Sequence, residues 1–535
     1  MRGLLLLLLA ACASTPITTV RFANQPAVWT VDDRHDVARP PASKAFRRYS
    51  YHFDSYYLRA ARGLALERSH RALGVNSLDE VPDSTWFTNR IGRRALTPAE
   101  VRRGPGPESP DLHLPWTIRK AKTGGTVPGF VVEDTRGVRF ILKLDRPELP
   151  EMQSGADAIV SRLLWAAGYN VPSDHAVYFR RQDLTIAADA TVVVDGHKRP
   201  LDDALLDARL GAPNAGDRYR GLASILIAGK PLGGTPRIGT RADDPNDLIP
   251  HELRRDQRGQ ASLMAWLANT DLKEDNTLDA WQADPANPAI HYVQHYLLDF
   301  GDALGADVAV TGHLHLGYRF EIDPAASLGS ILSLGLRREP WEDRRSVALR
   351  GVGVYSERLF DPAAWKPSTP AQLPVIWADR FDQFWGAKIM MRFTRAHLAA
   401  AVDAARLTDP RAAAYLVDTL ERRQHQVARY WFQQVAPLDE LVMEGDRLCF
   451  VDLARRAGFS PPFAHYTATA YSDRSRRLGP PVRVVPPATG QACVAIALAD
   501  RYTIVELEAA NGPAVQIHVA RGPGGRPRVI GLYRL

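Results

Sequence analysis

Cysteine is scarce in this sequence, and long apolar runs are absent after its first residues. Only 3 of the 535 residues are cysteines, too few for a disulfide scaffold or for a structural zinc site built on four cysteines. The run from Leu4 to Leu9 is far shorter than the ~20 residues that a membrane-spanning helix needs. No later apolar stretch approaches that length. We therefore expect a chain that does not cross a membrane.

An excess of charge of one sign is also missing. Lys and Arg number 67 against 60 Asp and Glu, a net charge of +7. A surplus this small, spread along the whole chain, is weak support for a nucleic-acid partner, and we expect none. The composition is 45% hydrophobic and 24% charged, close to globular averages, which excludes a disordered or fibrous chain. At ~150 residues per domain, two to four domains are expected.

The first twelve residues have the pattern of a bacterial export signal. A positive charge at Arg2 precedes the leucines, and small residues follow them in a Leu-Ala-Ala-Cys quartet that ends at Cys12. This quartet resembles the lipobox of bacterial lipoproteins, in which the cysteine is acylated and becomes the mature N-terminus. The resemblance implies a signal peptide over residues 1–11, a lipid on Cys12 and a membrane tether over residues 12–45. The alternative is an ordinary signal peptide in which Cys12 has no role.

A lipid on Cys12 would place the protein in the cell envelope. Position 13 is Ala13 rather than Asp, which by resemblance to enterobacterial sorting favours the outer membrane, with the protein facing the periplasm or the cell surface. Cys449 and Cys493 would then lie in an oxidising compartment and could form one disulfide. After about residue 440, helical periodicity gives way to short β runs. We therefore expect a separate β-rich domain over residues 440–535.

Residues 46–435 are predicted to form one large α+β domain. β-branched and aromatic runs between Trp116 and Leu144 predict three antiparallel strands with a glycine-rich turn after the first. Apolar residues spaced three and four apart predict a helix over residues 152–167. Further strands are predicted near residues 175–179 and 190–195, and further helices over residues 259–269, 381–405 and 411–433.

One segment of this domain has the pattern of a catalytic loop. Asp271 is followed by Lys273 and Asn276, and Asp299 opens an Asp-Phe-Gly motif after a β-like stretch. The register matches the catalytic loop and the metal-binding motif of protein kinases. In phosphoryl transfer, Asp271 would orient the proton of the attacking hydroxyl, and Lys273 would neutralise charge on the transferring group. Asn276 and Asp299 would supply hard oxygen ligands for Mg²⁺ or Mn²⁺.

The residues that would bind the nucleotide lie upstream. Lys143, in the third predicted strand, is placed to pair with phosphates. The first turn contains the residues whose backbone N–H groups could cradle phosphates, namely Gly124, Gly125 and Thr126. An acidic residue in the following helix should hold Lys143. Asp157 in the middle of that helix is preferred, and Glu151 at its start is the alternative.

Together these motifs resemble a protein-kinase-like domain over residues 114–435, nearer to divergent bacterial and secretory-pathway members than to ordinary Ser/Thr kinases. The resemblance implies a bilobal fold, with lobes over residues 114–195 and 215–435, and transfer of a phosphoryl group from ATP to a hydroxyl acceptor. The sequence departs from the family at Asn269-Thr270, where the family has His-Arg. It also has no clear Ala-Pro-Glu segment, so a peptide acceptor is the least supported part of the resemblance.

Two other functions remain open. Nucleotide triphosphates are scarce outside the bacterial inner membrane, so a kinase-like fold there could be a catalytically silent binding or scaffold module for another envelope protein. The same fold could instead transfer a nucleotidyl group, AMP, to its acceptor. His313 and His315 are spaced to lie on one face of a strand and could bind a metal, but the sequence shows no third ligand.

Overall fold

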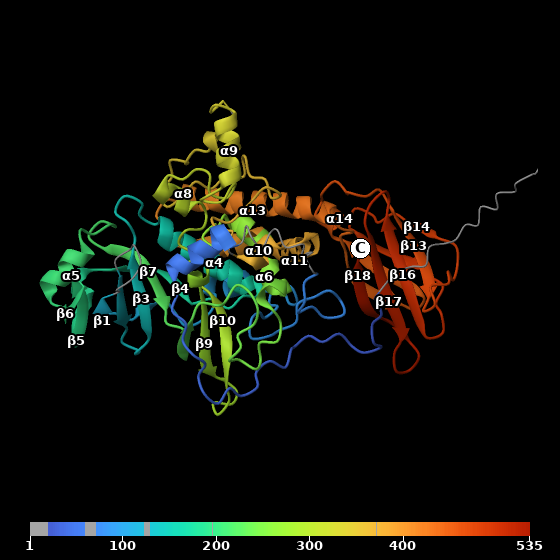
Figure 1. The fold of residues 1–535 in the computed structure, drawn as a ribbon, viewed down its shortest axis with the longest axis horizontal. Helices are drawn as coiled ribbons and strands as arrows, with labels where there is room; N and C mark the ends of the chain where they lie inside the picture. Colours follow the sequence, from blue (N-terminus) through green and yellow to red (C-terminus); the bar gives the residue numbers. More distant parts are fainter. Residues whose placement is uncertain (1–19, 59–70, 122–128, 195, 337, 371) are drawn as a thin grey trace, which may run out of the picture. The chain divides into compact units, whose positions relative to one another are not determined.

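A computed structural model describes residues 20–58, 71–121, 129–194, 196–336, 338–370 and 372–535 (Figure 1). The predicted lipidation site Cys12 and the predicted phosphate-cradling residues Gly124, Gly125 and Thr126 lie outside these ranges. The fold is mixed, with 27% helix and 26% strand. The described residues divide into a larger unit, within Val28–Asn76 and Glu80–Gln434, and a smaller unit, residues 20–27 with Ser77–Asp79 and Val435–Leu535. None of the described helices is long and apolar enough to cross a membrane.

The larger unit contains a seven-stranded mixed sheet with the order β4-β7-β3-β2-β1-β5-β6. Its strands are β1 (Trp116–Ala121), β2 (Gly129–Glu133), β3 (Arg139–Leu144), β4 (Asp174–Phe179), β5 (Leu184–Val194), β6 (His197–Pro200) and β7 (Tyr219–Ile225). β1 pairs with β5 in parallel, and the other neighbours pair antiparallel. The three antiparallel strands predicted between Trp116 and Leu144 are therefore present.

Alternation along β3 separates the hydrophobic core from the polar face of the sheet. Phe140, Leu142 and Leu144 are buried in one hydrophobic cluster with Trp116. Because successive side chains of a strand point to opposite faces, Lys143 lies on the other face. Helix α4 (Met152–Ala167) contacts β4 and β7. It spans the residues over which the sequence predicts a helix, and it ends where Gly168 adopts a positive φ.

The sheet extends beyond residue 195, where the sequence predicts the end of the first lobe. Strand β7 lies between β3 and β4, although helix α5 (Asp203–Leu210) precedes it in the chain. β7 has no alternating apolar pattern, because it contains the buried Arg220 and Gly221. A Cβ atom at Gly221 would lie 2.3 Å from the main-chain oxygen of Lys143, so only glycine fits this close approach to β3.

Helices form the rest of the larger unit's core. In its second half these include α6 (Arg255–Arg258), α7 (Gln260–Leu267), α11 (Arg380–Met390), α12 (Arg395–Asp403) and α13 (Pro410–Gln433). The single helix predicted over residues 381–405 is two helices, because Thr394 accepts a hydrogen bond from the main chain of His397 and starts α12 anew. The helix predicted over residues 411–433 is confirmed as α13. The remaining helices of this unit are α1 (Arg48–Phe53), α3 (Pro98–Arg103), α8 (Ala306–Thr311), α9 (Pro324–Leu332) and α10 (Leu373–Ile376).

A three-stranded antiparallel sheet brings the two predicted catalytic motifs together. It consists of β8 (Lys230–Gly233), β9 (Thr277–Ala283) and β10 (His291–Leu297). β9 begins directly after Asn276, and β10 ends two residues before Asp299. Because the two strands pair with Thr277 opposite Leu297, the main-chain N–H of Leu298 donates to the oxygen of Asn276 at 2.9 Å. The hairpin therefore places the two motifs side by side.

The smaller unit is β-rich, as the sequence predicts for residues 440–535. One sheet has the order β11-β12-β15 and the other β14-β13-β16-β17-β18. The bounds are β11 (Leu438–Glu444), β12 (Arg447–Asp452), β13 (Tyr466–Ser472), β14 (Val482–Val484), β15 (Gln491–Ala495), β16 (Tyr502–Ala509), β17 (Ala514–Arg521) and β18 (Pro527–Arg534), with a short helix α14 (Leu453–Arg456). Apolar residues of both sheets share one core.

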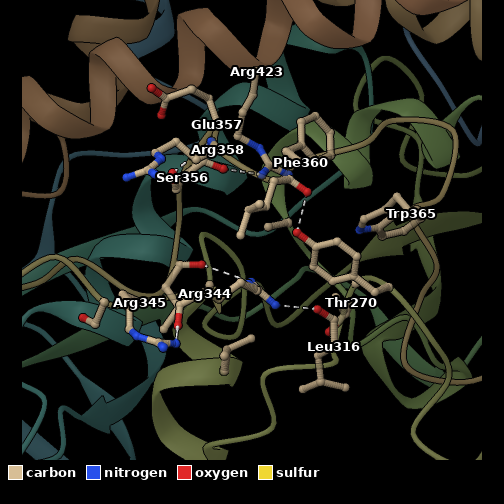
Figure 2. A pocket seen from close by; sticks show the side chains of 18 of the residues that line it. Thr270, Leu316, Arg344, Arg345, Ser356, Glu357, Arg358, Phe360, Trp365 and Arg423 are labelled. Carbon is tan, nitrogen blue, oxygen red and sulfur yellow. Dashed lines mark hydrogen bonds between the residues drawn. The ribbon is translucent and has the colours of Figure 1, made fainter. Parts of the chain in front are cut away.

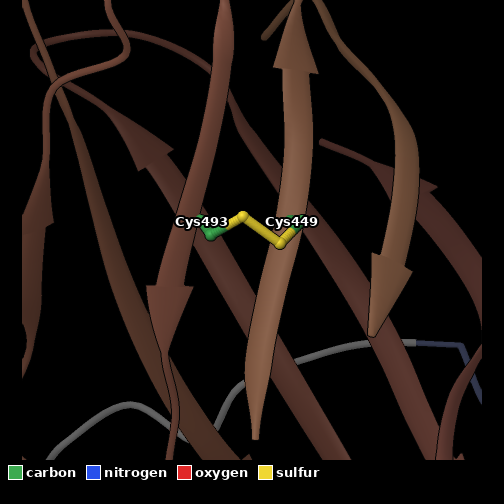
Figure 3. The surroundings of a disulfide bond; sticks show 2 residues. All are labelled: Cys449 and Cys493. Atoms are coloured by element: carbon green, nitrogen blue, oxygen red, sulfur yellow. A yellow bond between two sulfur atoms is a disulfide. The ribbon is translucent and has the colours of Figure 1, made fainter. Parts of the chain in front are cut away.

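The two cysteines of this unit are joined by a disulfide bond (Figure 3). Cys449 on β12 pairs directly with Cys493 on β15 in the antiparallel register. The Cα atoms of such neighbours are close enough for their side chains to bond. The bond links two strands that are separated by 44 positions in the sequence.

Candidate active site

The catalytic-loop segment leaves α7 through a sharp turn and is held by buried polar contacts. Ala268 has a φ of 48° and ends the helix. Asn269 and Thr270 are buried, and the Thr270 hydroxyl donates to the carboxylate of Asp307. The main-chain oxygen of Thr270 accepts two hydrogen bonds from Ser368, at 2.8 Å from its N–H and 3.0 Å from its hydroxyl. The backbone that carries the next residue, Asp271, is therefore fixed.

Lys273 and Asn276 both contact the carboxylate of Asp271. Lys273 Nζ lies 2.6 Å from Asp271 Oδ2. The side-chain amide of Asn276 donates to the same oxygen at 3.0 Å and to the main-chain oxygen of Asp271 at 2.7 Å. Burial disfavours the charged form of Lys273, but the carboxylates of Asp271, Asp299 and Asp302 outweigh it and raise its pKa. The side-chain N–H groups of Asn276 face Asp271, so the Oδ1 oxygen of Asn276 is the atom of this side chain that could bind a cation.

Lys143 and Asp299 meet although they belong to different parts of the unit. Lys143 Nζ lies 2.7 Å from Asp299 Oδ1. Burial opposes the positive charge of Lys143, but the negative charges of Asp157 and Asp299 prevail and raise its pKa. Asp299 has a φ of 58°, a left-handed conformation that few residues other than glycine adopt. Such backbone outliers concentrate at functional sites.

Asp157 holds the Asp-Phe-Gly segment from behind. Its Oδ1 accepts a hydrogen bond from the main-chain N–H of Phe300 at 2.8 Å, and a Cβ atom at Gly301 would lie 3.2 Å from its Oδ2. Burial and the neighbouring carboxylate of Asp174 raise the pKa of Asp157 well above its ordinary value, while Lys143 opposes this shift. Asp157 therefore lies in the field of Lys143, although its hydrogen bond goes to the main chain.

Glu151, the alternative partner of Lys143, faces elsewhere. Its carboxylate accepts from Arg350 Nε at 2.7 Å and from the main chain and hydroxyl of Thr408 at 2.9 and 2.7 Å. These contacts connect the start of α4 to the loop before α13. Of the two candidates, the structure brings Asp157 to the site and directs Glu151 away from it.

Two further carboxylates belong to this cluster and were missed in the sequence. Asp302 follows the Asp-Phe-Gly motif directly, and Gln153 of α4 donates to its Oδ1 at 3.1 Å. Burial and the charges of Asp271 and Asp299 raise the pKa of Asp302 to about 6. Asp174, at the start of β4, is buried, and burial raises its pKa to about 7. The Asp302 position could have been noticed from its neighbour Gly301, whereas no local pattern distinguishes Asp174.

The donor set around Asp299 fits a hard divalent cation. It consists of carboxylate and amide oxygens, which Mg²⁺ and Mn²⁺ prefer, and mutual repulsion between the carboxylates is what such an ion would relieve. These oxygens do not surround a common point in this structure, since Asp299 pairs with Lys143. Among the described residues, the one trio of His, Cys, Asp or Glu ligand atoms lying within 4.8 Å of one another is Glu444, Cys449 and Cys493. Those cysteines form the disulfide and offer no thiolate.

The space beside the catalytic-loop segment is narrow. A cavity of about 40 Å³ is lined by Asp271, Lys273 and Asn276, which is well below the ~300–1,000 Å³ of small-molecule sites. A nucleotide-sized ligand does not fit in this narrow cavity.

Comparison with known proteins gives no assignment. No protein-family model matches the chain, and no curated protein has a significantly similar sequence.

Proposed function

We propose that the larger unit is a bilobal, kinase-like domain that transfers a phosphoryl group from ATP to a hydroxyl acceptor. The seven-stranded sheet with α4 would form the lobe that contains Lys143, and the helices around α7 and α13 would form the lobe that contains Asp271. The observation that carries the proposal is a pair of short contacts between motif residues, Lys143 with Asp299 and Asn276 with Asp271. The charge of Lys273 links the two pairs, because it interacts with both Asp271 and Asp299.

The contacts match the demands of phosphoryl transfer, which needs charge neutralisation and positioning rather than covalent chemistry. Two ammonium groups interact with Asp299: Lys143 Nζ lies 2.7 Å from its Oδ1, and Lys273 interacts electrostatically with its charge. Such cations would neutralise phosphate oxygens on both sides of the transferring group. Asp157 orients the Asp-Phe-Gly backbone through Phe300 and so keeps Asp299 turned toward Lys143.

Asp271 would orient the acceptor hydroxyl. It already accepts hydrogen bonds from Lys273 and Asn276. An ionised carboxylate can accept a further hydrogen bond from a hydroxyl and take its proton as the bond to phosphorus forms. A Mg²⁺ or Mn²⁺ ion held by Asn276 and Asp299 would neutralise charge on the ATP phosphates.

The protein would work in the cell envelope, attached through a lipid on Cys12 to the outer membrane. Since ATP is scarce in that compartment, we keep two alternatives. One is transfer of AMP instead of the phosphoryl group, which the same charged cluster could support. The other is a silent kinase-like scaffold that binds an envelope protein. The cavity of only about 40 Å³ beside Asp271 is the observation that favours the scaffold.

The test is thermal unfolding of the purified chain with ATP and either Mg²⁺ or Mn²⁺. We expect a rise in melting temperature that Asp299→Ala abolishes and that Asp217→Ala keeps, because Asp217 is an exposed carboxylate paired with Arg180. No rise with any nucleotide would refute the enzyme and leave the scaffold. If ATP binds, ATP labelled on the γ-phosphate or the α-phosphate distinguishes the two transfers, since each label reaches the acceptor in one reaction only.

A further inference from the structure

A second cavity lies beside the catalytic-loop segment and is much larger than the first. Its volume is about 520 Å³, within the ~300–1,000 Å³ of small-molecule sites. Its lining includes Ala268, Thr270, residues 343–347, Val354 and residues 356–361, several of which are labelled in Figure 2. Asp271, Lys273 and Asn276 do not line it. The cavity is therefore distinct from the candidate active site.

Four guanidinium groups line this cavity: Arg344, Arg345, Arg358 and Arg423 (Figure 2). Arg423 donates to the main-chain oxygens of Ala265, Trp266 and Ser356, at 2.5, 2.9 and 2.9 Å. Arg344 likewise donates only to main-chain oxygens, those of Leu314, Leu316 and Val354. Among the described residues, none of the four forms an ion pair with a carboxylate. The carbonyl groups that accept from Arg344 and Arg423 do not neutralise the charges of these two guanidinium groups.

The carboxylates that line the cavity are engaged elsewhere. Asp343 pairs with Arg338 at 3.0 Å, and Glu357 pairs with Arg422 at 2.7 Å. Asp361 accepts from the main-chain N–H of Ala363 at 2.9 Å. Both arginine partners lie outside the lining, so they cancel two of its negative charges.

The fourth carboxylate of the lining, Asp307, is itself buried. It accepts hydrogen bonds from the hydroxyl of Thr270 and from the N–H of Val308. Burial raises its pKa to about 7, so it carries only part of a negative charge at neutral pH. The balance of the lining is therefore positive.

Because Arg344 and Arg423 are largely buried, their positive charges are unfavourable without a counter-ion. Desolvation lowers the pKa of Arg423 to about 10, and Arg344 adds to that shift by repulsion. Desolvation also lowers the pKa of Arg344. Two arginines that disfavour each other's charge in one wall would both be stabilised by an anion between them. The wall also has an N–H donor with no partner in the described chain, Nε1 of Trp365.

Aromatic rings complete the lining. The ring centroid of Phe360 lies 3.5 Å from the guanidinium carbon of Arg423, and the ring centroid of Tyr318 lies 5.3 Å from that of Arg344. A ligand here would meet ring faces as well as charged donors. We propose that this cavity binds a small organic anion, a phosphate monoester or a carboxylate with an apolar or aromatic body, at a site separate from the candidate active site.

Calorimetric titration of the full chain tests this site, with phenyl phosphate as the probe and phenol as its uncharged counterpart. EDTA in the buffer keeps metal-bridged phosphate from forming. We expect phenyl phosphate to bind with one-to-one stoichiometry and at least tenfold more tightly than phenol. Absence of binding, or equal affinity for phenol, overturns the proposal.

Variants locate the bound anion. The double variant Arg345→Gln with Arg358→Gln should weaken the binding of phenyl phosphate at least tenfold. Both residues are exposed, so the fold should tolerate the change. Trp365→Phe, which removes only the N–H donor from a similar ring, should weaken it about threefold, the scale of one neutral hydrogen bond. The control is Arg180→Gln with Arg411→Gln, which removes the same charge from exposed positions outside the cavity and should change little.

Two results would contradict this assignment. An equal loss in the control variant would mean that phenyl phosphate responds only to net charge. If Lys143→Met lost affinity for phenyl phosphate and the double arginine variant did not, the anion would bind in the candidate active site instead.

Discussion

Lys143 Nζ lies 2.7 Å from Asp299 Oδ1, although 156 positions separate the two residues. β3 presents Lys143 on the face of the sheet away from the hydrophobic core, and the β9–β10 hairpin delivers Asp299 to it. The pair closes the cluster that also contains Asp157, Asp271 and Lys273. Its ion pair is the part of the site that a bound nucleotide and metal would have to open.

Removal of the Lys143 charge should separate catalysis from folding. In Lys143→Met, the buried carboxyls of Asp157 and Asp174 lose their cation, and their raised pKa values let them take up protons instead. We therefore expect the fold to persist and any transferase activity to fall by roughly 100-fold or more, the scale of losing one electrostatic contact to the transition state. Activity with labelled ATP and circular dichroism measure the two effects. Lys198→Met, on the exposed strand β6, is the control, and equal activity in both variants would contradict the role of Lys143.

Asp157 in α4 and Glu151, which directly precedes α4, should behave differently. Asp157→Ala leaves the N–H of Phe300 without its acceptor, which costs about 1–3 kcal/mol, and it frees the Asp-Phe-Gly segment, so ATP should no longer raise the melting temperature. Glu151→Ala breaks the contacts to Arg350 and Thr408 and should lower stability while the response to ATP remains. Thermal unfolding with and without ATP and Mg²⁺ measures both. Loss of the ATP response in the Glu151 variant alone would reverse the assignment.

Stability should fall as pH rises from about 4 to about 7. Asp302 and Asp174 have folded-state pKa values of about 6 and about 7, above the ordinary 3.8, so the folded state holds their protons more tightly than the unfolded state. Deprotonation then costs folding free energy, roughly 1–3 kcal/mol for Asp302.

Asp302→Asn tests this origin of the pH dependence. It should flatten the fall between about pH 4 and 6, the interval between the ordinary and the raised pKa of this carboxyl. Urea unfolding at a series of pH values measures the slope. Asp217→Asn, at an exposed site, should leave the slope unchanged, and a similar slope in wild type and in Asp302→Asn would show that another group is responsible.

The disulfide should stabilise the smaller unit. Cys449→Ser with Cys493→Ser removes a cross-link between strands 44 positions apart, and a loop of that size is worth about 2–4 kcal/mol. We expect the smaller unit to unfold at a lower temperature in this variant, and wild type to show the same shift after its disulfide is reduced. Scanning calorimetry measures both transitions. An unchanged ATP response would show that the larger unit keeps its structure. No change in any transition would mean that the bond does not constrain the unfolded chain.

The local sequence was sufficient where a contact joins near neighbours. Asp271, Lys273 and Asn276 lie within six positions of one another, so their spacing alone predicts a shared site, and their side chains do meet. The apolar period of α4 and the β runs of residues 440–535 likewise predict elements that are present, because a helix face and a strand face are repeated every few residues. The prediction of one continuous helix over residues 381–405 is wrong, because the cap at Thr394, rather than the apolar period, decides where the second helix starts.

The tertiary structure alone decided what depends on distant pairing. The sequence favoured Asp157 over Glu151 without excluding Glu151, and only the packing of α4 shows which of the two carboxylates faces Lys143. It also offered no reason to include Asp174 or strand β7, because buried polar residues in a strand follow no period. By itself, the sequence determined the residue types and local spacing of the candidate site. Sheet register and helix packing determined which of those residues meet, because contacts between distant segments depend on how the whole core closes.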